Sequence, residues 1–247
     1  MNTSRPDWAD RMARLAAVEG AAGRSICFLS RTRGELTPIL LALTHAGVRH
    51  ATAIAPLVES ARVVALVDAA RGIVADEHPF HVLRRLRVGR GWVRDNPAAD
   101  SIGDDDHAAL DALMGWTTGF ATLEAFVPAY DAARARIAAL RDPSAPVELA
   151  TVHASKGREW ETVFLVGFEA DRIPNRRSLT DADDANRALE EERRLAYVAL
   201  TRATRQLILA FDPARPTPFL SEMGFRAISS ADGPHVTTMP GAQGQQC

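Results

Sequence analysis

The sequence predicts an α/β fold in which a parallel β-sheet is flanked by helices and interrupted by a small, all-helical insertion. Short apolar runs alternate with amphipathic helical segments over 24–74 and again over 147–222, which is the order of elements typical of parallel sheets covered by helices. Between these blocks, residues 75–146 carry helical periodicity and no strand signal. An N-terminal helix within 1–23 and a loose tail over 223–247 complete the expected organisation.

The first block opens with a helix and continues with alternating strands and helices. Apolar residues recur with helical spacing over 7–19, and a short apolar run over 25–29 predicts a buried strand. A helix over 34–46, a strand over 49–54 and a helix over 57–74 follow. The short turns between these elements favour a parallel sheet covered by helices.

The insertion and the second block are predicted from the same periodicities. The insertion should contain helices over 79–86, 104–116 and 122–140. The sheet pattern then returns, with strands over 147–152, 161–166 and 205–211 and a long helix over 183–201.

Composition and charge restrict the class of protein. The 247 residues are 47% hydrophobic and 24% charged, which is ordinary for a globular protein. No run of eighteen apolar residues and no signal peptide is present, so we expect no membrane span. Only Cys27 and Cys247 are found, which favours a reducing, cytoplasmic compartment. The 29 basic and 31 acidic residues nearly cancel, so any contact with DNA must be local.

The turn after the predicted strand 147–152 concentrates reactive side chains. His153, Ser155, Lys156 and Glu159 supply an imidazole, a hydroxyl, an ammonium and a carboxylate within seven residues. The carboxyl ends of parallel strands are where open α/β sheets bind ligands. The same residues are also compatible with a polar loop held by a capping serine.

The helix over 183–201 carries a second concentration of charge. Its acidic residues precede its basic ones, which suits the helix dipole and allows Glu190 to pair with Arg194. Arg202 follows at the helix end, just before a strand. Its guanidinium could project into a cleft or could cap the carbonyls of its own helix.

Together the two segments resemble the fifth and sixth motifs of the UvrD/Rep-type superfamily 1 DNA helicases. The resemblance runs through His153 to Trp160, 163–167, Ile173-Pro174 and Glu190 to Ala203, and a weaker match to the fourth motif covers Phe28 to Thr32. It implies that 24–74 and 147–222 form the second RecA-like domain of an ATP-dependent 3′–5′ DNA helicase, a family with members in DNA repair. The short stretch 75–146 would then be a reduced accessory subdomain.

The resemblance also implies roles for individual residues on the nucleotide side. Arg202 is similar to the arginine that reaches across the interdomain cleft to the ATP γ-phosphate, where a planar charge stabilises the transferring phosphoryl group. Arg31 would be a second γ-phosphate contact. Glu159 resembles the acid that contacts the ribose, and Lys156 and Gly157 would shape the loop beside the nucleotide.

On the DNA side, Thr151 and His153 resemble the family's contacts to single-stranded DNA phosphates, a local site that needs no basic surface. The sequence departs from the family pattern elsewhere. Ser30 stands where an adenine-stacking aromatic is frequent, Arg158 replaces the usual leucine, and Asp171-Arg172 replaces an acidic-Gly pair.

A Walker A loop, G-x-x-x-x-G-K-[ST], is absent from the sequence, because Lys156 is the single lysine and Gly157 follows it. We therefore expect ATP and Mg²⁺ to be bound mainly by a missing N-terminal RecA-like domain or chain, and this chain to have little or no ATPase activity alone. Single-stranded DNA and that ATPase domain are the expected partners. The alternative is a non-catalytic DNA- or protein-binding module derived from a helicase.

A basic stretch in the insertion leaves two interpretations open. It contains one aromatic, Trp92, among five arginines, Arg84, Arg85, Arg87, Arg90 and Arg94. Such a stretch could grip DNA and stack a base, or it could be a solvated helix face. No metal site is expected, because the histidines are scattered and lack cysteine partners.

Overall fold

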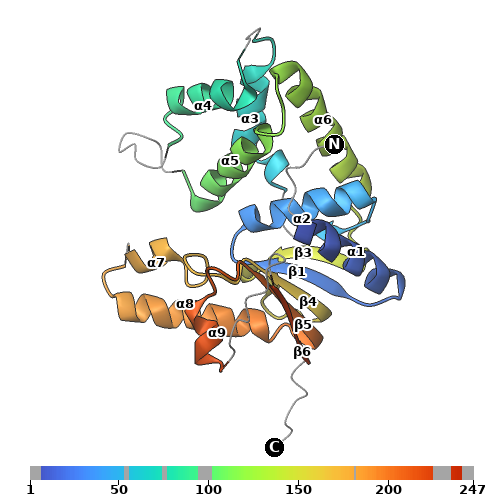
Figure 1. The fold of residues 1–247 in the computed structure, drawn as a ribbon, viewed down its shortest axis with the longest axis vertical. Coiled ribbons are helices and arrows are strands. Elements are labelled where there is room, and N and C mark those ends of the chain that lie inside the picture. The colour runs from blue at the N-terminus through green and yellow to red at the C-terminus, as the bar shows by residue number, and fades with distance from the viewer. Residues whose placement is uncertain are drawn as a thin grey trace, which may run out of the picture.

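Among the described residues, six strands form a single sheet (Figure 1). The computed structural model describes residues 7–52, 56–73, 77–93, 102–180, 182–224 and 235–240. The strands are β1 (Ile26–Ser30), β2 (Ala51–Thr52), β3 (Val147–Thr151), β4 (Trp160–Val166), β5 (Ala203–Phe211) and β6 (His235–Pro240), in the order β2-β3-β1-β4-β5-β6. The first five are parallel and β6 is antiparallel to β5. The α/β fold with a RecA-like parallel sheet is thereby confirmed.

Helices cover both faces of this sheet. The α1 helix (Asp7–Ala21) and α2 (Arg33–Ala46) lie on one face, and α7 (Arg176–Thr180), α8 (Ala185–Leu200) and α9 (Pro218–Glu222) lie on the other (Figure 1). Alternate residues of β1 follow this division, because Phe28 packs with the α1 and α2 side chains while Cys27 and Leu29 pack with those of α8. A strand buried on both faces must be apolar throughout, which accounts for the short apolar runs in the sequence.

The predicted insertion is helical. It contains α4 (Pro79–Gly89), α5 (Asp104–Thr117) and α6 (Leu123–Leu140). The helix predicted over 57–74 is instead a short 3₁₀ turn, Leu57–Glu59, followed by α3 (Ala61–Ala70). Although we placed α3 in the first sheet block, it packs against α4 and α5 and so lies within the helical group (Figure 1).

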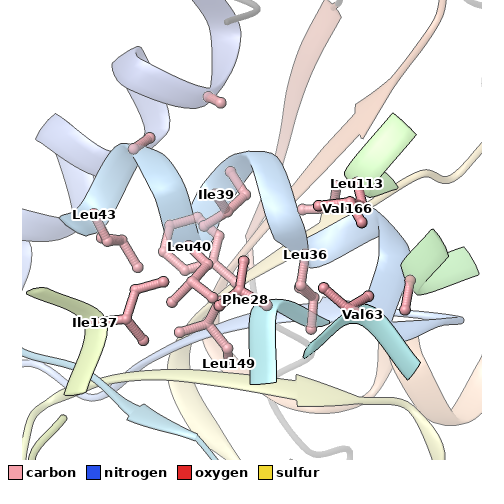
Figure 2. Close-up of a cluster of buried hydrophobic side chains, with 14 of the residues drawn as sticks. Phe28, Leu36, Ile39, Leu40, Leu43, Val63, Leu113, Ile137, Leu149 and Val166 are labelled. Atoms are coloured by element: carbon pink, nitrogen blue, oxygen red, sulfur yellow. The ribbon is translucent and has the colours of Figure 1, made fainter. Parts of the chain in front are cut away.

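The helical group (α3 to α6) and the face of the sheet that α1 and α2 cover share one hydrophobic core. Phe28 of β1 stacks on Phe164 of β4 with ring centroids 4.7 Å apart. Figure 2 shows Leu36, Ile39, Leu40 and Leu43 of α2 between this layer and the helical group, with Val63, Leu113 and Ile137 in the same cluster. The buried Tyr130 hydroxyl donates to the carbonyl of Val58 at 2.7 Å, so its polar end is satisfied inside the core.

The elements α7, α9 and β6 were not expected from the sequence. Within the segment expected to be a loose tail, His235–Pro240 pair with β5, so that expectation is wrong for these residues. The strand forms because the edge of β5 supplies its backbone partners. A segment of six residues held in this way need not carry a strand pattern in its own sequence. No helix of the described residues is long and apolar enough to cross a membrane.

The start of α2 carries a buried carboxyl group. Glu35 accepts hydrogen bonds from the backbone N–H groups of Arg31 and Thr32 at 3.0 and 3.1 Å, which otherwise lack partners at a helix start. Its side chain is only 9% exposed, and Arg172 is 4.0 Å away. Burial outweighs these favourable contacts and raises the pKa of Glu35 from 4.5 to about 7.

Glu35 should therefore make stability depend on pH in a defined direction. A folded-state pKa above the unfolded value means that the folded protein holds the proton more tightly, so the free energy of unfolding should fall as pH rises from about 4.5 to about 7. The fall should be up to about 3 kcal/mol. Urea unfolding of wild type and Glu35→Gln across this range measures it, because the amide keeps an acceptor for the helix start but does not ionise.

The difference between the two proteins isolates Glu35 from the other carboxyl groups. As a matched control, Glu191→Gln on α8, whose native side chain is 62% exposed, keeps Glu35 and should therefore show the same pH profile as wild type. Parallel pH profiles for wild type and Glu35→Gln would contradict the prediction.

Candidate nucleotide and DNA-contact site

The residues between β3 and β4 cross the sheet without an α-helix. Both strands run parallel to β1 and flank it, with Ser30 opposite Thr151 on one side and opposite Val166 on the other. Thr151 therefore ends β3 at the carboxyl edge of the sheet, while Trp160 begins β4 at the amino edge. The segment 152–159, which we name the crossover loop, must pass over β1 to connect them.

The crossover loop is ordered by its own backbone and by two hydroxyl groups. Val152 N–H donates to the Ser30 carbonyl at 2.9 Å, and a 3₁₀ turn follows over His153–Ser155. The buried Ser155 hydroxyl donates to the Val152 carbonyl at 2.7 Å, and the Thr151 hydroxyl accepts from Ala154 N–H at 3.4 Å. Ser155 lies inside this turn and bonds back to the Val152 carbonyl rather than capping a helix start, and it helps to hold the loop that presents the other polar residues.

Those other polar residues point outward. His153, Lys156, Gly157 and Glu159 are all exposed, and the described residues provide no hydrogen bond or ion pair to the His153, Lys156 or Glu159 side chains. Gly157 has a φ of 76°, which a residue with a side chain rarely adopts, so glycine is needed at this turn.

Arg158 has a specific partner. Its guanidinium makes a bidentate ion pair with Glu148 of β3, with one N–O distance of 2.6 Å. Its Cζ atom lies 4.9 Å from the ring centre of Trp160, whose indole N–H also donates to Glu148 at 3.2 Å. The arginine that replaces the family's leucine is therefore accommodated by a carboxylate on the neighbouring strand.

Arg202 lies against the end of the crossover loop. Its Nε donates to the Val198 carbonyl at 3.0 Å, so Arg202 caps the carbonyl end of α8. Its Nη1 also donates to the Arg158 carbonyl at 3.1 Å, and its own carbonyl accepts from Trp160 N–H at 3.0 Å. Glu159, between Arg158 and Trp160, is thereby held beside Arg202.

Arg31 is held further along α8. Its Nη2 lies 2.9 Å from a carboxylate oxygen of Glu192, whose other oxygen accepts from Asn175 N–H at 3.0 Å. Glu192 precedes Arg202 by ten residues, or about 15 Å along a helix axis. Arg31 and Arg202 thus contact α8 at separate turns in this conformation, with Arg31 near Thr151 at the carboxyl edge.

Glu148 and Glu192 are functional candidates that the sequence analysis missed. Glu192 is one of three successive glutamates, but it shares helical spacing with Ala188, Ala196 and Ala199, which are all buried. That spacing could have identified it as the buried member of the run. Glu148 sits in an otherwise apolar strand, and a lone carboxylate at such a position suggests a specific partner.

The basic stretch of the insertion is engaged within the protein. The Trp92 ring contacts both Arg62 and Arg90, whose Cζ atoms are 5.2 and 5.4 Å from its centre. Arg85 and Arg87 pair with Glu77 and Asp111, each at 2.7 Å, and Arg94 lies outside the described residues. These contacts favour the solvated-face interpretation over base stacking by Trp92.

A large hollow lies elsewhere, between α2, α5, α6 and the ends of β4 and β5, with a volume of about 1530 Å³. Glu35, Trp116 and Gly167 line it, and the candidate site residues of the crossover loop and Arg202 do not. Among the described residues, no group of three or more acidic, histidine or cysteine side chains could hold a metal ion.

Comparison with known proteins matches the part of the chain that carries the candidate site residues other than Arg31. Residues 129–212 match the family model of the UvrD-like helicase C-terminal domain. DNA helicase II of Rickettsia typhi is 45% identical over 69 residues, which are 28% of this chain and 10% of that protein. DNA helicase II of Escherichia coli is 48% identical over 69 residues, 28% of this chain and 9% of that protein.

A third relative, the ATP-dependent DNA helicase PcrA of Leuconostoc citreum, is 49% identical over 63 residues, which are 26% of this chain and 8% of that protein. The matches thus span about a tenth of the length of these curated relatives. The matched family region includes β3, the crossover loop, β4, α8 and β5. Residues 129–212 are thus similar in sequence to the UvrD-like helicase C-terminal domain.

Proposed function

We propose that this chain is the second motor domain of an ATP-dependent 3′–5′ DNA helicase. The observation that carries the proposal is the contact between the crossover loop and the end of α8, which brings Glu159 beside Arg202. Both belong to segments that match the family pattern, and both lie at an edge of the sheet where a second domain can approach.

Arg202 is proposed as the catalytic residue that the domain supplies to ATP hydrolysis. A guanidinium is always charged and donates in a fixed plane, so it can stabilise the charge spread over the transferring phosphoryl group. In this conformation it bonds to the Val198 and Arg158 carbonyls, and it would exchange part of that set for phosphate oxygens when a partner domain closes.

The other nucleotide-side roles follow from the same arrangement. Glu159 is exposed and acidic, as an acceptor for ribose hydroxyls must be. Lys156 and Gly157 would shape the loop beside the nucleotide, and Arg31 would contact the γ-phosphate from its place beside Glu192. Mg²⁺ and most of the ATP contacts would come from a Walker A domain, whose metal neutralises phosphate charge during transfer.

Thr151 and His153 are proposed to contact single-stranded DNA. They lie at the carboxyl edge of β3, and His153 is exposed on the 3₁₀ turn. With a formal net charge of −2 the molecule offers no general attraction to DNA, so recognition would depend on a few phosphate contacts at this edge.

The motor role predicts a requirement for both a Walker A domain and Arg202. The purified chain with single-stranded DNA should hydrolyse ATP at a negligible rate, and addition of a UvrD-type Walker A domain should produce turnover. Arg202→Ala should then lower turnover by about a thousandfold or more, because it removes the transition-state charge contact. Steady-state ATP hydrolysis measures this effect.

Arg187→Ala is the matched control, because the native Arg187 side chain lies on α8, the helix that precedes Arg202, and is 80% exposed; turnover should be unchanged. Robust hydrolysis by the chain alone would overturn the proposed division of labour. Turnover that is indifferent to Arg202→Ala would favour the alternative, a DNA- or protein-binding module derived from a helicase.

The DNA role predicts a local effect at the crossover loop. His153→Ala should weaken binding of a fluorescent single-stranded oligonucleotide by about tenfold, because it removes a hydrogen bond to a charged phosphate. Fluorescence anisotropy at fixed salt measures the change. His45→Ala, an exposed histidine on the opposite face of the sheet, should bind like wild type. Equal affinities for wild type and His153→Ala would exclude His153 as a contact.

A further inference from the structure

Glu148 is a buried carboxylate in β3, where Val147, Leu149 and Ala150 are apolar. It is 8% exposed, on the face of the sheet that α8 covers, and it lies in register with Cys27 of β1. Burying a charge is costly unless it is paired and hydrogen-bonded. Glu148 meets that requirement with donors from two residues, Arg158 and Trp160.

These two donors fix the last residues of the crossover loop. Arg158 presents its guanidinium in the planar, bidentate geometry that gives the strongest directional constraint on an arginine. The Trp160 ring is packed under that guanidinium and is itself only 6% exposed. The backbone between the two residues, which includes Glu159, is therefore held at both ends.

The constraint continues to Arg202 through the main chain. The carbonyl of Arg158 accepts from Arg202 Nη1 at 3.1 Å, and Trp160 N–H donates to the carbonyl of Arg202. A shift in the Arg158 backbone would move the acceptor that orients the outer end of the Arg202 guanidinium. The contacts of Nε with the Val198 carbonyl and of Nη2 with the Thr201 hydroxyl, at 3.4 Å, would remain, but they leave Nη1 without its partner.

We propose that Glu148 is a positioning residue for Arg202, acting through the side chains of Arg158 and Trp160 and through the Arg158 carbonyl. This inference rests on the motor role proposed for Arg202. The ion pair between Glu148 and Arg158 also explains the arginine at position 158. The leucine usual at this place would make only an apolar contact, whereas Arg158 makes a directional contact with Glu148.

Hydrogen exchange at the Arg202 guanidinium tests this in the full chain without ATP or a partner. NMR should detect protected Nη1 hydrogens in wild type, assigned by their loss in Arg202→Lys. Glu148→Gln should speed their exchange by about fivefold, the factor that corresponds to one net hydrogen bond, while the Nε hydrogen stays protected by Val198. A change confined to thermal stability, with Nη1 exchange as in wild type, would overturn the proposal.

Arg158→Lys provides a second variant that keeps a positive charge beside the buried carboxylate. An ammonium cannot make the bidentate contact, so Nη1 exchange should again be faster in a folded protein. Glu161→Gln is the matched control, since Glu161 accepts from Ser25 N–H at 3.0 Å at the same sheet edge, apart from Arg158; exchange should be unchanged.

Unprotected Nη1 hydrogens in wild type, or wild-type exchange in Arg158→Lys, would contradict the inference. ATP turnover with an added Walker A domain tests the motor role separately. The exchange rates are measured on the chain without ATP or a partner domain. A failure of the positioning role of Glu148 is therefore distinguishable from a failure of the motor role of Arg202.

Discussion

The central constraint on this structure is that β1 is flanked on both sides by parallel strands that are consecutive in the second half of the chain. β3 and β4 cannot be joined by a tight turn, because a parallel connection must return from one edge of the sheet to the other. Here that return is the crossover loop of eight residues. Reactive side chains are therefore distributed along a path between the two edges, with Thr151 near one end and Glu159 near the other.

This distribution explains why the candidate residues form two groups. Arg31, Thr151 and His153 gather at the carboxyl edge, where β1 and β3 end. Glu159 and Arg202 gather at the amino edge, where β4 and β5 begin. The long α8 helix runs between the groups, since Glu192 contacts one and the end of the helix contacts the other. A loop and a helix thus connect both ends of the sheet on the same face.

Much of this arrangement could be predicted from the sequence, because the core strands are buried on both faces and are therefore mostly apolar. The ranges of α2, α6 and β4 agree with the prediction to within one residue or so. What could not be predicted depends on partners distant in sequence. β6 needs the edge of β5, α3 joins the helical group by packing, and the environment of Arg158 depends on Glu148 ten residues earlier. Periodicity within a segment carries no information on such partners.

The core that joins the helical group to the sheet has a mechanical consequence. Leu36, Leu40 and Leu43 of α2 contact both layers, and the Tyr130–Val58 hydrogen bond ties α6 to the turn before α3. Swinging the helices away from the sheet would expose this apolar surface to water, at a cost of about 25 cal/mol for each Å². The helices are therefore expected to move together with the sheet, so that any rotation of the sheet carries them along as part of one body.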